Sequence, residues 1–572
     1  MPSRFFTLLI FFILYTLNGC NSTIVTPTSV QFSATVEPVS TSTATLQVPI
    51  STVLPASPTS TPDPLSLSLR LATARGWNKL DPFATTSADY YKIFANTFSS
   101  LVRYKTGEGT RPFVHEVVPD LASSWEQPDD KTYIFRLNQD ARWSDLPAVN
   151  GRSVTGDDVV QSLEYLMLES VHGWMWEKVK SIELVDASTV RISLLEPQAS
   201  FLDLLASGFN VIMPTEIWES DEYDLARGPL IGSGPFVFMP EVSEFTRAAE
   251  FRRNPNFYES GGNVEFLSWL IVPNDATRVA LFETGQLDVL RIPPGEIARY
   301  TDKKHPEMIV GLQTIPVGWM VSLNHQPTVM NKWGDQLPFA DGRIREALSL
   351  AIDREDIFQT HFKGASLLGL SMPVPSHNAQ IKEDELRELL RYDSQEATGI
   401  LQEALPRGQT LQFELIIPNM GQISDSVGEL IADDFREIGA EVEIVKVSLE
   451  RYTATVLTNP GNFQAAFGPS RSYFSADHWL RGRFLTNGSH NASSISNVEL
   501  NLMIDIQSNR TDPKQRAAAL RQAQRLVLEN YHSLPIHPDA EWLAVKSRVS
   551  GWSTFHDYPH QRFLREISLK DS

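Results

Sequence analysis

The sequence predicts an α/β protein with more than one folded domain. From about Leu65 to the end of the 572-residue chain, segments with the period of a strand alternate with segments with the period of a helix. Alternation over roughly 500 residues is typical of sheets covered by helices, and it exceeds the usual length of one domain. The first 64 residues have a different composition, so we expect the folded body to begin after them.

The predicted strands carry alternating or continuous apolar residues. The first is "LSLSLRLATA", which places Leu65, Leu67, Leu69 and Leu71 on one face. Further strands are predicted at Thr132–Leu137, Thr189–Leu195 and Phe266–Pro273.

The predicted helices have recognisable ends. Thr155 is the expected N-cap of a helix that has acids in its first turn and apolar residues at helical spacing, Val159, Leu163 and Leu166. Asp341 and Asp353 are the expected N-caps of two later helices, and Gly439 ends a third. In "GSGP", we expect Gly232 and Gly234 to permit positive φ in a turn and Pro235 to set its exit.

Cys20 is the only cysteine, and it follows a short apolar run that begins at Phe5 after the basic Arg4. A basic start, a short apolar run and a small residue before the cut are typical of a secretory signal peptide. The tetrad Leu17-Asn18-Gly19-Cys20 resembles the bacterial lipobox, in which the cysteine receives a diacylglycerol, although Asn18 departs from the usual small or β-branched residue. We therefore interpret residues 1–20 as a lipoprotein signal peptide with lipidation at Cys20. The alternative is an ordinary signal peptide with an incidental cysteine.

Residues 21–64 are rich in Ser, Thr, Pro and Val and nearly free of charge. Such a segment buries too little apolar surface to offset the entropy of ordering, so we expect a disordered stalk. Because Cys20 is the only cysteine and precedes the folded body, the body has no cysteine for a disulfide, a nucleophile or a zinc site. The formal net charge of -20 argues against a nucleic-acid partner.

Seven stretches in sequence order resemble the family 5 extracellular solute-binding proteins, the dipeptide, oligopeptide and nickel receptors of ABC importers. Each is weak alone, and together they cover the chain from about Leu65 to its end. They are "LDP" (80–82), "PDLASSWEQPDDKTYIFRLNQDARWSD" (119–145), "VTGDDVVQSLE", "IGSGPFVF" (231–238), "RNPNFYE" (253–259), "ETGQLDV" (283–289) and "PFADGRIREALSLAIDREDI" (338–357).

The resemblance implies a periplasmic-binding-protein-like fold of type II in its large form, with two lobes joined by two hinge strands. Lobe I would comprise residues 65–272 plus 541–572 and include an extra subdomain, and lobe II residues 273–540. The first crossing would fall near Ile271–Asn274, and the chain would return near Pro535–Lys546. A ligand would lie between the lobes and be buried by closure.

The resemblance and local pattern together indicate five candidate ligand-binding residues. Met320 and Ser322 lie on one face of "WMVSLN", opposite Trp319, Val321 and Leu323, and the family uses this strand in its site; the alternative is a half-exposed strand. Arg291 suits a carboxylate or phosphate, or is a solvated arginine. Trp77 lies in a loop that reaches ligands in relatives, or packs in the core.

Ser472 is the fifth candidate, because it occupies the position at which peptide-binding members carry an aspartate that pairs with the peptide's amino terminus. Asp477 is acidic but lies five residues later. The departure leaves room for another solute, such as an oligosaccharide or a blocked peptide.

The expected function is a lipid-anchored, extracytoplasmic, monomeric receptor that passes a peptide or similar small solute to an ABC permease, without cofactor, metal or chemistry of its own. A surface hydrolase is the first alternative, but the sequence has no Gly-x-Ser-x-Gly, His-Glu-x-x-His or P-loop motif. Scattered histidines without ligand spacing are interpreted as surface residues: His172, His361, His478, His490 and His560. A sensory or adhesive module of the same fold is the second alternative.

Overall fold

The computed structural model describes residues 67–570 except 78–79, 86–89, 107–115, 220–222, 227, 229, 245, 302–307, 332–333, 335, 363–370, 375–378, 472, 474 and 553–560. The signal peptide, Cys20, the stalk and Ser472 lie outside the described residues.

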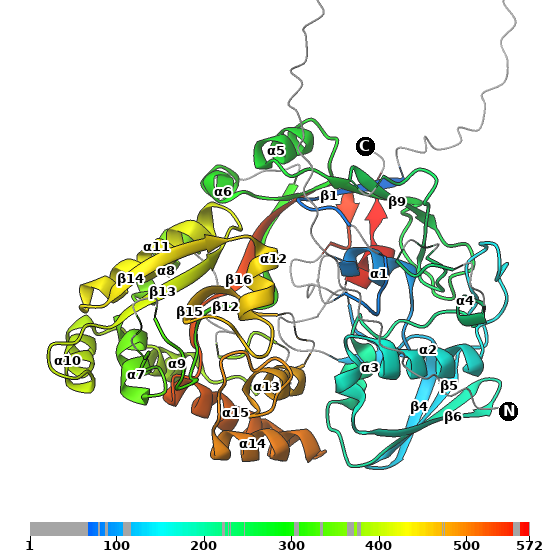
Figure 1. Ribbon diagram of the computed structural model, residues 1–572. Helices are drawn as coiled ribbons and strands as arrows, with labels where there is room; N and C mark the ends of the chain where they lie inside the picture. The colour runs from blue at the N-terminus through cyan, green and yellow to red at the C-terminus, as the bar shows by residue number, and fades with distance from the viewer. Residues whose placement is uncertain are drawn as a thin grey trace, which may run out of the picture. The chain divides into compact units, whose positions relative to one another are not determined.

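The first lobe contains two four-stranded sheets that share one hydrophobic core (Figure 1). One sheet has the order β1-β10-β9-β8, with β1 parallel to β10 and the other pairs antiparallel. Leu69 and Leu71 of β1 are buried, as the predicted alternation requires. The bounds are β1 (Ser68–Thr73), β8 (Phe236–Phe238), β9 (Ala248–Arg253) and β10 (Phe266–Ile271).

The second sheet of this lobe is an antiparallel sheet in the order β4-β5-β7-β6, with helix α2 (Gly156–Glu169) packed against β6 and β7. Thr155 caps α2 as predicted: its hydroxyl accepts from the Asp158 N–H, and the Asp158 carboxylate accepts from the Thr155 N–H. The bounds are β4 (Ala122–Asp129), β5 (Thr132–Leu137), β6 (Val179–Asp186) and β7 (Thr189–Leu194).

The second lobe is organised by a six-stranded sheet in the order β11-β16-β12-β15-β13-β14. Its two longest strands, β12 and β16, pair antiparallel from Met308 opposite Lys546 to Val321 opposite Leu534. The short β11 pairs with the distal end of β16, and the Asp288 N–H ahead of it donates to the Arg70 carbonyl of β1, which joins this sheet to the first lobe. The bounds are β11 (Val289–Arg291), β12 (Met308–Leu323), β13 (Gln412–Pro418), β14 (Glu441–Val447), β15 (Ala465–Pro469) and β16 (Leu534–Lys546).

The expected return of the chain, Pro535–Lys546, lies within β16. The expected first crossing, Ile271–Asn274, lies between β10 and helix α5, ahead of β11 and β12. The lobe boundaries at residues 272 and 540 stay predictions.

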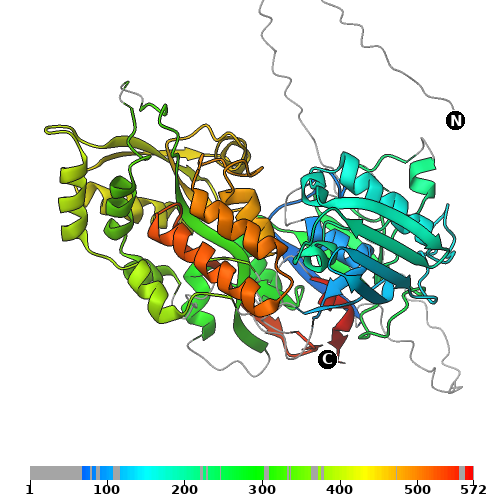
Figure 2. The same cartoon turned by 90° about the horizontal axis from the view of Figure 1, so that it is seen from below.

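The helices of the second lobe form separate cores, and only some of these cores include residues of the sheet. Trp319, Val321 and Leu323 pack with α7, α8 and α11 in one core, while α13, α14 and α15 form another. Asp341 and Asp353 cap α7 and α8 as predicted. Figures 1 and 2 show α14 and α15 side by side. The bounds are α7 (Gly342–Ala351), α8 (Arg354–His361), α9 (Glu383–Leu389), α10 (Ser394–Ala404), α11 (Gln422–Glu437), α12 (Leu449–Val456), α13 (Ala476–Phe484), α14 (Val498–Asn509) and α15 (Pro513–Glu529).

The remaining described elements are short and connect these parts. They are α1 (Tyr91–Thr97), β2 (Val102–Tyr104), β3 (Val117–Pro119), η2 (Gly173–Trp176), α3 (Phe201–Ala206), α4 (Glu216–Glu219), α5 (Asp275–Glu283), η3 (Pro294–Glu296), α6 (Ile297–Thr301), β17 (Val549–Ser550), η4 (Gln561–Glu566) and β18 (Ser568–Leu569).

The glycines of "GSGP" serve a different purpose from the predicted one. Neither Gly232 nor Gly234 has positive φ, and each lies so close to the backbone of α1 that a Cβ would approach Thr97 atoms to 1.9 and 2.6 Å. Contact between two chain segments, and not turn conformation, therefore requires glycine here. Gly439, in contrast, ends its helix with φ of 94° as predicted.

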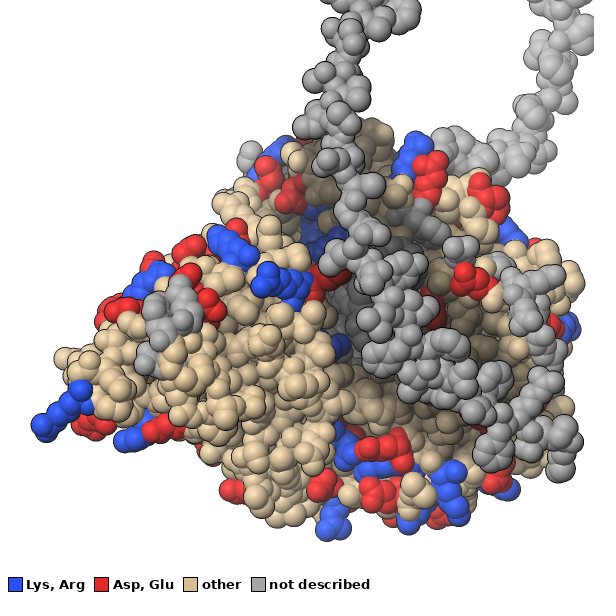
Figure 3. Space-filling model, in the orientation of Figure 1, with Lys and Arg blue, Asp and Glu red and all other residues tan. Residues whose placement is uncertain are grey.

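Charged side chains of both signs are interspersed over the face of the molecule seen in Figure 3. Within the described part of the chain, no helix combines the length and apolarity that a bilayer span requires.

Candidate functional site

Helix α13 carries most of the side chains of the candidate site. It follows β15, which pairs with the central strand β12. Ser475 fixes the start of the helix, because its hydroxyl accepts from the His478 N–H at 3.2 Å. The pairing of β15 with β12 therefore places the chain just ahead of α13, and the Ser475 cap stabilises the first turn of the helix.

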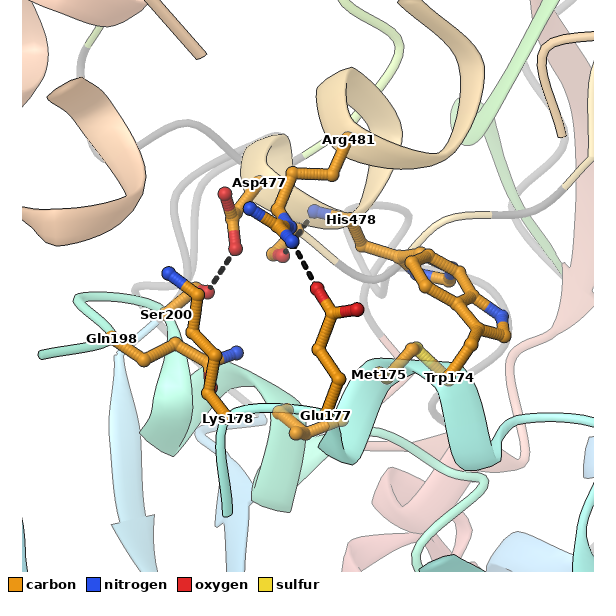
Figure 4. A pocket seen from close by; sticks show the side chains of 11 residues that line it. Trp174, Met175, Glu177, Lys178, Gln198, Ser200, Asp477, His478 and Arg481 are labelled. Atoms are coloured by element: carbon orange, nitrogen blue, oxygen red, sulfur yellow. Dashed lines mark hydrogen bonds and ion pairs between the residues drawn. The ribbon is translucent and has the colours of Figure 1, made fainter. Parts of the chain in front are cut away.

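The amino-terminal half of α13 contacts the first lobe at η2 and the start of α3 (Figure 4). The Ser200 hydroxyl donates to Asp477 Oδ2 at 2.8 Å, and Gln507 of α14 donates to the other oxygen of Asp477. Arg481, one turn further along, forms an ion pair with Glu177. The side chains at this contact line a narrow pocket.

A second set of contacts joins the first lobe to α14 and α15. The Ala199 N–H donates to the Ser508 carbonyl at 2.8 Å, and Lys178 donates to Ser508 Oγ and Asn509 Oδ1 at 3.1 and 2.8 Å. Arg516 of α15 donates to the Ala199 carbonyl at 3.1 Å. Most of these contacts are hydrogen bonds that involve at least one side chain. Polar contacts of this kind suit two surfaces that separate and meet again.

Behind this contact lies a group of basic and aromatic side chains, which we call the basic cluster. Trp174 of η2 lies with its ring 5.1 Å from His478 and 5.3 Å from His490, and Tyr473 contacts both histidines from the other side. The members of the cluster are His172 and Trp174 from the first lobe and Arg471, Tyr473, His478, Arg483 and His490 from the second.

Burial disfavours the charged form of every histidine in the basic cluster. It lowers the pKa of His172 to about 4 and that of His490 to about 3, and it holds the pKa of His478 well below its ordinary value. The neighbouring guanidinium of Arg471 lowers all three pKa values further. These imidazoles are therefore neutral at pH 7.

Two of the candidate residues from the sequence lie next to this cluster on β12. Ser322 is 3% exposed, and its hydroxyl accepts from Arg483 at 2.8 Å. Met320 is also 3% exposed and accepts from the Ser533 hydroxyl through its sulfur at 3.2 Å. The second face of this strand is thus covered by other side chains and is not half-exposed.

The other candidates are dispersed. Trp77 is 3% exposed in the core of the first lobe. Arg291 is on the surface and pairs with Glu541 at 2.8 Å. Their roles, like those of Met320, Ser322 and Ser472, stay predictions.

The interpretation of the histidines as surface residues was wrong for His172 and His478, which are 4% and 6% exposed. They are buried because aromatic rings cover them: Phe209 lies 3.8 Å from the His172 ring, and Trp174 and Tyr473 flank His478. Sequence reasoning also missed Trp174, Arg471 and Arg483. The available signal was the run of basic and aromatic residues around "GPSRSYFSADHWLRGRF", which no local period explains.

Comparison with known proteins identifies the fold and the family. The sequence model of the bacterial extracellular solute-binding proteins, family 5, matches residues 116–491. This chain belongs to that family. The match includes α13 and nearly all of the basic cluster, and it confirms the resemblance that the seven sequence stretches indicate.

The relatives of this solute-binding protein differ in what their names say they bind. It is 25% identical over 486 residues to the heme-binding protein A of Haemophilus influenzae, covering 80% of this chain and 84% of the relative. It is 24% identical over 383 residues to the nickel-binding periplasmic protein of Escherichia coli, covering 62% and 67%.

The structure of the periplasmic binding protein DppA from Helicobacter pylori, in complex with the peptide STSA, has the same fold. It superimposes with a TM-score of 0.72 at 21% identity, over 88% of this chain and 98% of that one. The two-lobed fold predicted from the sequence is therefore confirmed. The family comprises extracytoplasmic solute-binding proteins of ABC importers and not enzymes, which excludes the hydrolase alternative. Among the described residues, no three His, Cys, Asp or Glu side chains are grouped so that they could hold a metal ion.

Proposed function

We propose that this protein is a lipid-anchored receptor that encloses a peptide or similar small solute between its lobes and delivers it to an ABC permease. The observation that carries the proposal is the direct polar contact between α13 of the second lobe and the first lobe. Because the contact is made of hydrogen bonds and an ion pair, water can replace it when the lobes separate.

The receptor is expected to close when it binds solute. Native mass spectrometry of the freshly purified chain should show a bound small molecule, and X-ray scattering should show expansion after the molecule is removed by unfolding and refolding. Identical scattering curves with and without the bound molecule would contradict closure. Conversion of the molecule by the purified protein would contradict the receptor function.

A disulfide can trap the closed form, because the Ala199 N–H and the Ser508 carbonyl lie 2.8 Å apart across the contact. In a Cys20→Ser background the chain has no other cysteine, so the pair Ala199→Cys and Ser508→Cys can form only one intramolecular bridge. Bound solute should accelerate bridge formation. Each single cysteine variant is the control.

The anchor has its own test. Cys20→Ser should move the protein from the membrane fraction to the soluble or culture fraction, because two acyl chains anchor a protein stably whereas none does. Residues 21–64 should act as a spacer, so their deletion should leave the thermal unfolding of the body unchanged. Retention of the serine variant on membranes would contradict the lipoprotein assignment without affecting the receptor proposal.

A further inference from the structure

The basic cluster lacks negative charge. No carboxylate forms an ion pair with Arg471 or Arg483 among the described residues. The one acid next to the cluster in sequence, Asp477, has its two oxygens engaged by Ser200 and Gln507. Besides burial, other histidines and arginines of the cluster lower the pKa values of His478 and His490.

The two arginines also have few hydrogen-bond acceptors. A guanidinium carries five N–H donors. Arg483, which is 7% exposed, donates to Ser322 only, and its Nε lacks an acceptor among the described residues. Within the described part of the chain, the Arg471 guanidinium donates to one acceptor, the Leu457 carbonyl, at 2.8 Å. Burying a guanidinium with so few partners is unfavourable, and such groups occur preferentially where a protein receives a ligand.

The position of the cluster fits a ligand that is enclosed by both lobes. Trp174 and His172 come from the first lobe, while Arg471, Arg483 and His490 come from the second. Gly482 lies against the cluster, since a Cβ there would come to 3.2 Å from His490 Nδ1 and 3.4 Å from the indole of Trp174. A group bound between these side chains would therefore hold the lobes together.

We propose that the solute carries a carboxylate or another oxyanion, and that Arg471, Arg483 and His490 receive this group. The inference rests on the proposed receptor function and names its class of solute. Arginine binds oxyanions through two parallel hydrogen bonds, and a neutral imidazole adds one N–H donor. Trp174 and Tyr473 form aromatic walls beside the anion, which favour an apolar group close to it.

The test uses four dipeptides that separate the two terminal charges: Ala-Phe, N-acetyl-Ala-Phe, Ala-Phe amide and N-acetyl-Ala-Phe amide. Calorimetry with the full-length protein should show that the two carboxylates bind at least ten-fold more tightly than the two amides, whether or not the amino terminus is acetylated. Arg483→Gln should remove the preference. His490→Gln should reduce it and serves as the second variant if Arg483→Gln does not fold.

Lys446→Gln is the matched control, because it removes one positive charge from the edge strand β14 and leaves the cluster intact. It should retain the full preference for carboxylates. Equal binding of acids and amides, or affinity set by the free amino terminus, would overturn the inference and leave the receptor function standing.

If none of the four peptides binds, the chemical class of the solute that co-purifies with the protein tests the inference. An oxyanion supports the inference, and a neutral or cationic solute overturns it. Absence of any bound solute, together with unchanged X-ray scattering, contradicts the receptor function and the inference with it.

Discussion

Two pairs of arginines in the second lobe, Arg345 with Arg354 and Arg471 with Arg483, have very different surroundings. Arg345 and Arg354 come from the "DGRIREALSLAIDRE" stretch, and each is 6% exposed. Arg354 donates to the carbonyls of Pro535 and Ser349 at 2.8 and 2.9 Å, and Arg345 donates to those of Phe339, Ala340 and Asn530. Among the described residues, the buried Arg483 donates a hydrogen bond to the Ser322 hydroxyl alone.

The number of hydrogen-bond acceptors around each guanidinium distinguishes an arginine with a structural role from one that we propose binds a ligand. A guanidinium surrounded by carbonyls ties helices and strands together and needs nothing more. A guanidinium with most of its donors unused favours any arrangement that brings an acceptor. Burial lowers the pKa of Arg354 to about 10 and also lowers that of Arg483, so enclosure alone does not distinguish the two.

The largest expected effect is the loss of a structural arginine. Arg354→Met should lower the free energy of unfolding by at least about 3 kcal/mol, because it removes the buried hydrogen bonds from the guanidinium to the carbonyls of Pro535 and Ser349. Urea unfolding measures the change. Arg451→Met, which alters an exposed arginine, is the control and should change stability by less than about 0.5 kcal/mol. A small effect of Arg354→Met would show that the carbonyls are dispensable acceptors.

Acid should destabilise the protein through its buried histidines. The folded-state pKa values of His172, His490 and His532 lie at about 4, 3 and 4, below the ordinary 6.5, so the unfolded chain binds protons first as the pH falls below 6.5. Each such proton lowers stability by about 1.4 kcal/mol per pH unit, down to the folded-state pKa. Asp434 acts in the opposite direction, because burial raises its pKa to about 6.

Urea titrations between pH 7 and pH 4 test this balance. His490 faces Arg471, Arg483, His172, His478 and Tyr473, and His490→Gln should flatten the loss of stability in this range. Asp434→Asn should steepen it. Stability that is constant or rises from pH 6.5 to pH 4.5 would contradict the burial of neutral histidines.

Adding a carboxylate beside Arg471 should change which terminal charge the protein prefers. Ser472→Asp should improve the affinity for a peptide with a free amino terminus by about ten-fold, or 1.4 kcal/mol, and leave that for its N-acetylated form unimproved. The new acid would supply a partner for an ammonium and compete with a bound carboxylate for the arginines. Tight calorimetric binding of unblocked peptide amides by the unmodified protein would show that another acid, such as Asp477, already has this role.

Among the buried arginines, the smallest expected effect on stability is that of Arg483→Met. The change removes one hydrogen bond to Ser322 and also a buried charge that lacks a counter-ion, and these contributions oppose each other. We expect a change within about 1 kcal/mol in urea unfolding. A loss comparable to that of Arg354→Met would mean that Arg483 is structural and that the contrast between the two pairs does not hold.

Much of the fold was predictable because its signals are local. Thr155, Asp341 and Asp353 cap their helices through bonds to residues two or three positions ahead, and β5 matches its predicted range, Thr132–Leu137. The alternation of Trp319, Val321 and Leu323 predicted which face of β12 packs in the core. The reason for Gly232 and Gly234 was not predictable, because it depends on a helix 135 residues earlier (232 less 97) in the chain.

The sequence by itself determined the family, the secondary structure and the unusual residue at the expected anchor position. Tertiary structure alone decided which basic residues converge. Arg483 meets Ser322 across 161 positions and Arg481 meets Glu177 across 304, and neither pair follows from a helical or strand period. Local periods specify which way a side chain points from its own helix or strand. Which other side chains it contacts depends on the path of the chain between elements, and that path is set by packing over the whole core.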